Sequence, residues 1–181
     1  ERKKAIDFTV PYAATPAAFA TAKDGPLANA AGTGSDVTLD VGQTGVAEIE
    51  ALKEAFKGKT VGIQASTVYA KFIYDNFGDI ATIREYKTGG DRDIDLQNGR
   101  IDVGFDDSVY FQNAFDAAGG TLTFTGPQIY GPIWGEGEGL GVRKSDPELR
   151  DMFSEAIKSA LADGTIKTLS EKWFKRDVSP K

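Results

Sequence analysis

The central part of the chain alternates between short strand-like segments and longer amphipathic segments. The strand-like segments favour extended backbone, and the longer ones carry apolar residues at helical spacing. An alternation of this kind predicts an α/β fold, with a parallel sheet covered by helices on its faces. The expected strands are 60–63, 82–86, 101–105 and 121–125, and the expected helices are 67–77, 91–99 and 108–119.

The flanking segments are less regular. Residues 24–46 are rich in Gly, Ala, Ser, Thr and Asp without strong periodicity, which predicts a long surface excursion. Near the C-terminal end, Ser145 to Glu148 fits a capping box that would open a helix. The remaining expected elements are strands at 5–10, 17–22 and 140–143 and helices at 47–56, 146–162 and 165–174.

The two C-terminal helices have one short strand and almost no sheet to cover. Their apolar side chains recur at helical spacing and need a partner surface that this chain does not supply. We therefore expect a second copy of the chain to cover them, which makes a homo-oligomer the predicted assembly. The residues concerned are Leu149, Phe153, Ile157, Leu161, Leu169 and Trp173.

Composition removes several classes of function. The 21 basic and 27 acidic residues give a net charge of −6, which makes nucleic acid an unfavourable partner. The chain has no cysteine and no histidine, so disulfides, thiolate nucleophiles, His-based catalysis and the usual zinc sites are excluded, and no cofactor or metal is expected. It begins with ERKKAIDF, without an apolar signal stretch, so either a signal has been removed or the chain starts inside a longer protein.

The turn after the strand at 60–63 carries small and polar residues where packing alone would not demand them. Ser66 and Thr67 stand at the expected start of the helix 67–77. Ligands of open α/β sheets bind beyond the carboxyl ends of the strands, and the N–H groups at a helix N-terminus favour an anion. A plain helix cap explains the same residues. The turn therefore predicts either a cap or a site for a carboxylate or phosphate.

A pair of carboxylates ends the strand at 101–105. Asp106 and Asp107 precede Ser108, which opens the next helix, and Asp107 is the expected cap of that helix. A carboxylate at this edge of the sheet can also accept hydrogen bonds from a ligand ammonium group. Together with Ser66 and Thr67 on a neighbouring strand, Asp107 would place a cation site beside an anion site. That pairing matches an α-amino acid.

Other motifs fit their templates poorly. Asp91, Asp93 and Asp95 imitate the start of a calcium loop, but the sixth position is Leu96 where such a loop needs glycine. The glycine-rich GEGEGLG at 135–141 matches neither a dinucleotide nor a P-loop pattern. Adjacent strand residues point to opposite faces, so Asp106 and Asp107 do not form an acid/base pair. The sequence gives no positive sign of catalysis.

Five stretches carry a resemblance to a known family, in the order of that family: ERKKAIDFTVPY, GKTVGIQASTVYAKF, LQNGRIDVGFDDS, GEGEGLGVRKSDPELRDMFSEAI and DGTIKTLSEKWF. With these stretches, the whole chain resembles the periplasmic substrate-binding proteins of polar amino acid ABC transporters. The lysine/arginine/ornithine-, histidine- and opine-binding proteins are the types it is most similar to. The resemblance implies a type II periplasmic-binding-protein fold, in which two α/β lobes close over one amino acid, and a permease of an ABC importer as the partner.

The resemblance also assigns roles to four residues. Arg2 matches the arginine that grips the ligand carboxylate with a bidentate fork. Ser66 and Thr67 match the residues that receive this carboxylate at the helix N-terminus, and Asp107 matches the aspartate that binds the α-ammonium group. Opine-binding relatives look to have an amide at the position of Asp107, because the nitrogen of their ligand is secondary. Asp107 therefore favours an ordinary amino acid.

The resemblance implies that the chain is N-terminally truncated. The family pattern places about 70–90 residues before Glu1, roughly half a lobe. We expect the end of the first lobe and a hinge strand at 1–13, a complete second lobe at 14–127, and the hinge return with the C-terminal helices of the first lobe at 128–181. Such a chain is expected to bind its ligand weakly or not at all.

Two alternatives to a periplasmic binding component remain open from the sequence. Dehydratases resemble these binding proteins, and Asp107 or Glu136 would then have to act as the acid. A ligand-sensing module of a receptor would carry the same binding lobe. The expected function is nevertheless non-enzymatic: binding of a polar, basic L-amino acid in the periplasm.

Overall fold

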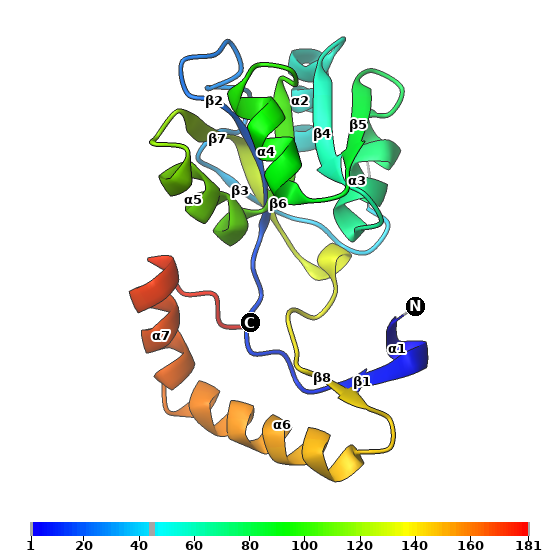
Figure 1. Cartoon of the computed structure of the whole chain (residues 1–181), viewed down its shortest axis with the longest axis vertical. Helices are drawn as coiled ribbons and strands as arrows, with labels where there is room; N and C mark the ends of the chain where they lie inside the picture. Colours follow the sequence, from blue (N-terminus) through cyan, green and yellow to red (C-terminus); the bar gives the residue numbers. More distant parts are fainter. Residues whose placement is uncertain (1, 44–45, 181) are drawn as a thin grey trace. The chain divides into compact units, whose positions relative to one another are not determined.

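Two compact units make up the chain (Figure 1). One unit comprises Pro16–Trp134, and the other comprises Glu1–Thr15 and Gly135–Lys181. The computed structural model describes residues 2–43 and 46–180, without the side chain of Arg2. Within these residues no helix combines the length and the apolar character that a membrane span requires.

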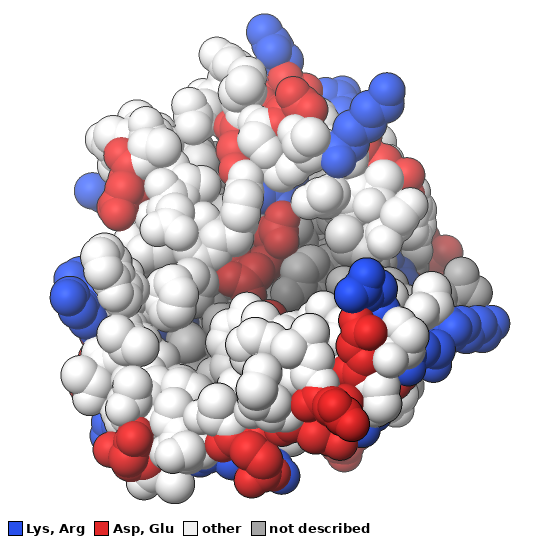
Figure 2. All heavy atoms as spheres, turned by 60° about the horizontal axis from the view of Figure 1, so that its bottom comes forward, with Lys and Arg blue, Asp and Glu red and all other residues white. Residues whose placement is uncertain are grey.

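The surface carries both signs of charge. Figure 2 shows acidic and basic side chains interspersed over one face of the molecule. Because the acidic residues outnumber the basic ones and the net charge is −6, the average field around the chain attracts cations.

The Pro16–Trp134 unit is built on a six-stranded mixed sheet. Its strand order is β3-β7-β2-β6-β4-β5. β4 runs parallel to both β5 and β6, and β3 runs parallel to β7, whereas β2 is antiparallel to β6 and β7. The bounds are β2 Ala17–Ala22, β3 Asp36–Thr38, β4 Thr60–Gln64, β5 Thr82–Tyr86, β6 Val103–Asp107 and β7 Leu122–Tyr130.

The four strands expected to be parallel, which are β4, β5, β6 and β7, run in the same direction, and β2, which the predicted alternation did not include, runs antiparallel between β6 and β7. The residues of β2 are buried at five successive positions, so the polar/apolar pattern carries no signal of strand direction. The surface excursion at 24–46 contains the short strand β3, and the strand expected at 121–125 continues to Tyr130. Gly126, with φ of 62°, and Pro127 look like a strand end in the sequence, but β7 passes through them beside an irregular register with β2.

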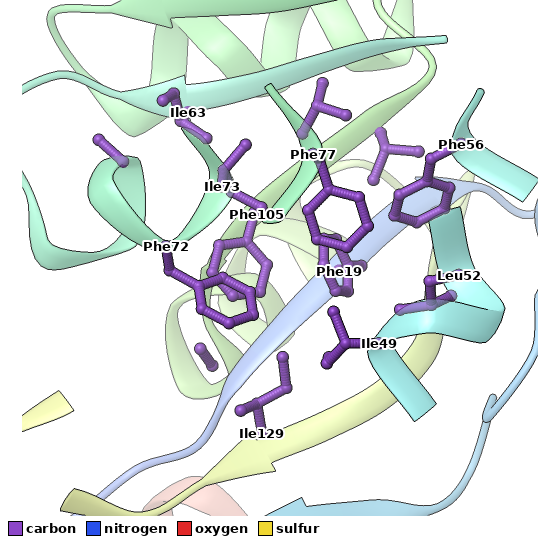
Figure 3. Close-up of a cluster of buried hydrophobic side chains, with 14 of the residues drawn as sticks. Phe19, Ile49, Leu52, Phe56, Ile63, Phe72, Ile73, Phe77, Phe105 and Ile129 are labelled. Atoms are coloured by element: carbon purple, nitrogen blue, oxygen red, sulfur yellow. The ribbon is translucent and has the colours of Figure 1, made fainter. Parts of the chain in front are cut away.

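Helices cover both faces of this sheet. α2 and α3 pack on one face around Phe19, whose ring centroid lies 5.1 Å from Phe56 and 4.4 Å from Phe105 (Figure 3). α4 and α5 pack on the other face against a smaller cluster with Leu96 and Phe111. The bounds are α2 Ala47–Phe56, α3 Val68–Phe77, α4 Gly89–Gln97, α5 Ser108–Ala117 and the 3-10 turn η1 Pro132–Trp134.

The other unit has a two-stranded sheet and two long helices. β1 Ile6–Phe8 pairs antiparallel with β8 Gly141–Arg143, and α1 Arg2–Ala5 precedes β1. The strand expected at 5–10 is therefore shorter than predicted. The helices are α6 Pro147–Ala162 and α7 Thr165–Phe174.

The capping box expected at the start of α6 is wrong. Asp146 is the N-cap residue, and its side chain makes no capping hydrogen bond. Its carboxylate instead accepts hydrogen bonds from Arg143 at 2.7 Å and from the hydroxyl of Ser145 at 3.1 Å. Pro147 occupies the first helical turn, where a missing N–H costs nothing.

The apolar faces of α6 and α7 are poorly covered. Among the described residues of these helices, Ser154 and Ser170 are the buried ones. The exposed fraction is 61% for Met152 and 67% for Trp173. Tyr12, Leu169, Trp173, Phe174 and Val178 line a groove of about 380 Å³ beside α7. This unit therefore presents an apolar surface that its own residues do not cover.

Candidate ligand-binding site

The candidate site lies where neighbouring parallel strands end. β4 and β6 pair in parallel, with Val61 opposite Val103 and Gly62 opposite Gly104, so their carboxyl ends meet at the same edge. Neighbouring strands lie about 4.8 Å apart. The turn after β4 and the residue that ends β6 are therefore adjacent on one side of the sheet, as expected from the sequence.

The turn after β4 presents the N-terminus of α3 at this edge. Ser66 is exposed and adopts a φ of 62°, a left-handed conformation that is uncommon for residues other than glycine. Thr67 is the N-cap: its hydroxyl accepts a hydrogen bond from the N–H of Ala70 at 3.1 Å and donates one to the carbonyl of Gln64 at 2.9 Å. Thr67 therefore caps α3, and the other N–H groups of the first turn of this helix have no acceptor within the helix.

Asp107 ends β6 and caps α5. Its Oδ1 accepts hydrogen bonds from the N–H groups of Val109 at 2.8 Å and Tyr110 at 2.9 Å, which confirms the expected cap. The residue is half-buried, so its carboxylate is not sealed inside apolar packing.

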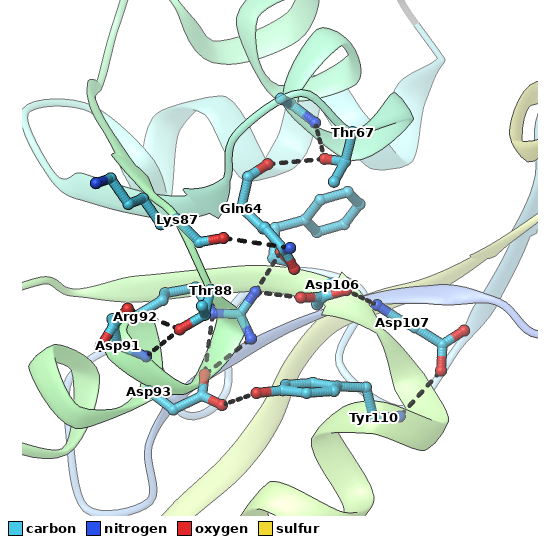
Figure 4. Close-up of polar contacts among 12 residues, drawn as sticks. Gln64, Thr67, Lys87, Thr88, Asp91, Arg92, Asp93, Asp106, Asp107 and Tyr110 are labelled. Atoms are coloured by element: carbon cyan, nitrogen blue, oxygen red, sulfur yellow. Dashed lines mark hydrogen bonds and ion pairs between the residues drawn. The ribbon is translucent and has the colours of Figure 1, made fainter. Parts of the chain in front are cut away.

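The neighbouring Asp106 points to the opposite face of the sheet and is buried. Its Oδ2 pairs with Nη1 of Arg92, and its Oδ1 accepts a hydrogen bond from the backbone N–H of Asp107 at 2.8 Å (Figure 4). This agrees with the expectation that the two aspartates do not act as a pair on one face.

Arg92 is the residue of this region that the sequence did not reveal. It lies in the run of acidic residues that was considered as a calcium loop, and the structure makes this run part of α4. Arginine is rarely buried, so nothing in the local pattern marks Arg92 as an interior residue. Within the described residues no group of three or more acidic, His or Cys side chains could hold a metal ion.

Tyr110 in α5 extends the contacts of Arg92 by binding Asp93 in α4. Its hydroxyl donates a hydrogen bond to Oδ2 of Asp93 at 2.8 Å. Burial, and then the hydrogen bond to the Asp93 carboxylate, raises the pKa of Tyr110 to about 12. The hydroxyl is therefore protonated, and acts as a donor, throughout the physiological range.

One predicted site residue cannot be placed. The side chain of Arg2 lies outside the described residues, so only its position at the start of α1 is known. Ser66, Thr67 and Asp107 are brought together at one edge of one sheet.

Comparison with known proteins identifies relatives over almost the whole chain. The octopine-binding periplasmic protein of Rhizobium meliloti is 32% identical, with 99% of this chain and 68% of the relative covered. The L-arginine-binding protein of Pseudomonas aeruginosa is 31% identical, with 98% and 62% covered. The chain thus spans about two thirds of the length of these relatives. Both are named as binding proteins.

A solved structure agrees with the sequence relatives. The crystal structure of a periplasmic His/Glu/Gln/Arg/opine family-binding protein from Silicibacter pomeroyi, in complex with lysine, matches with a TM-score of 0.68 and 29% identity. The match covers 99% of this chain and 67% of that structure. It confirms the expected fold class, that of the periplasmic amino acid-binding proteins.

A family model gives the same assignment. The model of the bacterial extracellular solute-binding proteins, family 3, matches residues 1–176. The family consists of solute-binding proteins and not of enzymes, so the dehydratase alternative has no support among these relatives. From its fold, its relatives and this match, the chain belongs to family 3 of the bacterial extracellular solute-binding proteins.

Proposed function

We propose that this chain binds a polar L-amino acid as the solute-binding component of an ABC importer in the periplasm. The observation that carries the proposal is the adjacency of two features at one edge of the sheet. The N-terminus of α3 follows β4, and the carboxylate of Asp107 ends β6, the strand paired with β4. The first suits an anion and the second a cation, which is the charge pattern of an α-amino acid.

The α-carboxylate of the ligand would lie at the turn of Ser66 and Thr67. The left-handed conformation of Ser66 turns the chain sharply at the entrance to α3. The N–H groups and the dipole of the helix then favour negative charge, and the exposed Ser66 hydroxyl adds a donor. By resemblance to the family, Arg2 would supply a bidentate contact to the same carboxylate.

The α-ammonium group would lie against Asp107. The cap of α5 orients this carboxylate through two N–H groups, so its direction is set before a ligand arrives. A preorganised acceptor loses little conformational entropy on binding. Asp107 therefore serves both as a cap and as the proposed ammonium site.

The proposed side-chain class of the ligand is basic. The relatives include proteins named for octopine and L-arginine, and the similar solved structure holds lysine. The net charge of −6 also favours a cationic ligand through long-range attraction.

We propose two partners for the chain. The first is the membrane permease of an ABC importer, with residues 14–127 as the ligand-binding lobe and 1–13 with 128–181 as part of the other lobe. The second is another copy of this chain, which would cover the apolar groove beside α7. Large exposed apolar side chains on one surface, such as Leu169 and Trp173, favour self-association in water.

The test compares Asp107→Asn with a matched control. Asparagine keeps a capping oxygen but loses the charge, so α5 is retained while the proposed ammonium contact is weakened. The control is Asp116→Asn, which makes the same charge change at an exposed position of the same helix. Titration with L-arginine, followed by amide NMR shifts, should show an affinity loss of about tenfold in Asp107→Asn alone. Equal affinities in both variants would overturn the proposal.

A further inference from the structure

Arg92 is buried in the interior of the Pro16–Trp134 unit, next to two glycines. The residue is fully buried, although an arginine is among the costliest side chains to bury. Two glycines that face each other across β4 and β6, Gly62 and Gly104, lie beneath its side chain. A Cβ added to Gly62 would lie 3.0 Å from Cγ of Arg92, and one added to Gly104 would lie 3.3 Å from its Nε. The two glycines therefore leave room for the stem and Nε of Arg92, and Gly62 also leaves room for Cδ1 of Ile101, which an added Cβ would meet at 2.4 Å.

The guanidinium group joins α4 to the end of β6. Its Nη1 donates to the carbonyl of Phe105 at 3.1 Å and to Oδ2 of Asp106. Its Nε and Nη2 donate to Oδ1 of Asp93 at 2.9 and 2.8 Å. The ring of Phe111 lies against the same group, with 4.6 Å between its centroid and Cζ. Arg92 thus holds the two residues of β6 that directly precede Asp107.

Asp106 links Arg92 to the backbone of the proposed site residue Asp107. One carboxylate oxygen is held by Arg92, and the other accepts the backbone N–H of Asp107 at 2.8 Å. A rotation of the Asp107 backbone would break that hydrogen bond or disturb a buried ion pair. Replacing a buried ion pair by well-packed apolar side chains is often neutral or stabilising, so fold stability alone gives a weak reason for this arrangement.

We propose that Arg92 and Asp106 are positioning residues that fix Asp107 for the α-ammonium group of the ligand. The inference rests on the proposed function, because it assigns to Asp107 the ammonium contact described above. Asp106 acts from the face opposite to the ligand, through the backbone of its neighbour, and Arg92 acts through Asp106. The outer hydrogen bond from Tyr110 to Asp93 holds the second carboxylate that receives Arg92.

The experiment measures the ammonium preference of the site. This preference is the ratio of two dissociation constants, that of des-amino arginine divided by that of L-arginine, from amide NMR titrations of the full chain. Asp106→Asn removes the charge that pairs with Arg92 and keeps an oxygen in its place. We expect the ratio to fall by about fivefold in this variant and to stay unchanged in the Asp116→Asn control.

A purely structural role gives a different result. Loss of fold stability would weaken both ligands equally and leave the ratio unchanged in Asp106→Asn, which would overturn the inference. A wild-type ratio near one would instead overturn the proposed function, so the two failures are distinguishable. Where Asp106→Asn does not fold, Tyr110→Phe provides the second test, since it releases Asp93 without opening a cavity. Its expected fall in the ratio is about twofold, and an unchanged ratio in a folded Tyr110→Phe would overturn the inference.

Discussion

The hydroxyl group of Tyr110 in α5 donates a 2.8 Å hydrogen bond to the carboxylate of Asp93 in α4. The contact ties together the two helices that cover one face of the sheet, and burial together with this contact keeps the phenol protonated to a higher pH than in the unfolded chain. The pKa of Tyr110 is about 12 in the fold, against 10.0 for an unperturbed tyrosine, and burial is the largest cause.

This shift predicts an alkaline loss of stability. Because the pKa of Tyr110 is raised in the fold, its contribution is complete below about pH 10 and is lost as the pH rises toward 12. The free energy of unfolding should fall more steeply over this interval in the wild type than in Tyr110→Phe. Urea unfolding at a series of pH values measures both curves. Parallel curves from pH 9 to 12 would contradict the assignment.

Thr67 should contribute to the stability of α3 as its N-cap. Replacing it with alanine removes the acceptor for the N–H of Ala70, so Thr67→Ala should lower the free energy of unfolding by about 1 kcal/mol. Thr67→Ser keeps a hydroxyl at the cap and serves as the control, with an expected loss of a few tenths of a kcal/mol. Denaturant unfolding measures the free energy of unfolding of both variants. Equal stabilities for the alanine and serine variants would show that the cap contributes nothing.

The Pro16–Trp134 unit should fold without the rest of the chain. It contains the six-stranded sheet, both apolar clusters and the Arg92 network, so its core needs no residue from outside. A fragment of residues 16–134 should show dispersed amide NMR signals and a single cooperative unfolding transition. A fragment with collapsed signal dispersion and gradual unfolding would refute the division into units.

Self-association is expected through α7. Trp173 is 67% exposed and Leu169 is 48% exposed, next to the apolar groove. Changing both to glutamine should shift the chain from a larger species to a monomer in light scattering after gel filtration. Val41→Gln, at an exposed apolar position of the other unit, is the control and should change nothing. A well-folded wild-type monomer at high concentration would rule out this assembly.

Much of the fold was predictable from local pattern. The helices at 47–56 and 165–174 agree with α2 and α7 because their apolar spacing and flanking residues act within the segment itself. Strand direction was not predictable for β2, because a run of residues buried on both faces is typical of parallel strands, whereas β2 is antiparallel to its neighbours. The continuation of β7 beyond Gly126 depends on pairing with β2 and β3, which are distant in the sequence.

The candidate site divides in the same way. Ser66, Thr67 and Asp107 were predictable because each lies at or just after the carboxyl end of a strand, and parallel strands bring such positions to one edge. Arg92 was not predictable, since its burial depends on the two facing glycines of β4 and β6 and on Asp106, which come from separate segments. The contacts of Arg92 and Asp106 behind Asp107 therefore become visible only in the packed structure.

The affinity of the isolated chain should be low. Ser66 is exposed and Asp107 is only half-buried, so water screens the ionic contacts that each would make. We expect a dissociation constant for L-arginine on the order of 1 mM, measured by calorimetry or by NMR titration. Sub-micromolar binding by this chain would contradict the expectation.

The most direct test maps each charged group of the ligand onto the protein. The isotope-labelled chain is titrated with L-arginine, with des-amino arginine and with agmatine, which lacks the carboxylate, and the amide shifts are compared. We expect that agmatine loses the shifts at residues 66–69, whereas des-amino arginine loses those at 107–110. Shifts at neither segment with L-arginine, or the same pattern of shifts with all three ligands, would contradict this expectation.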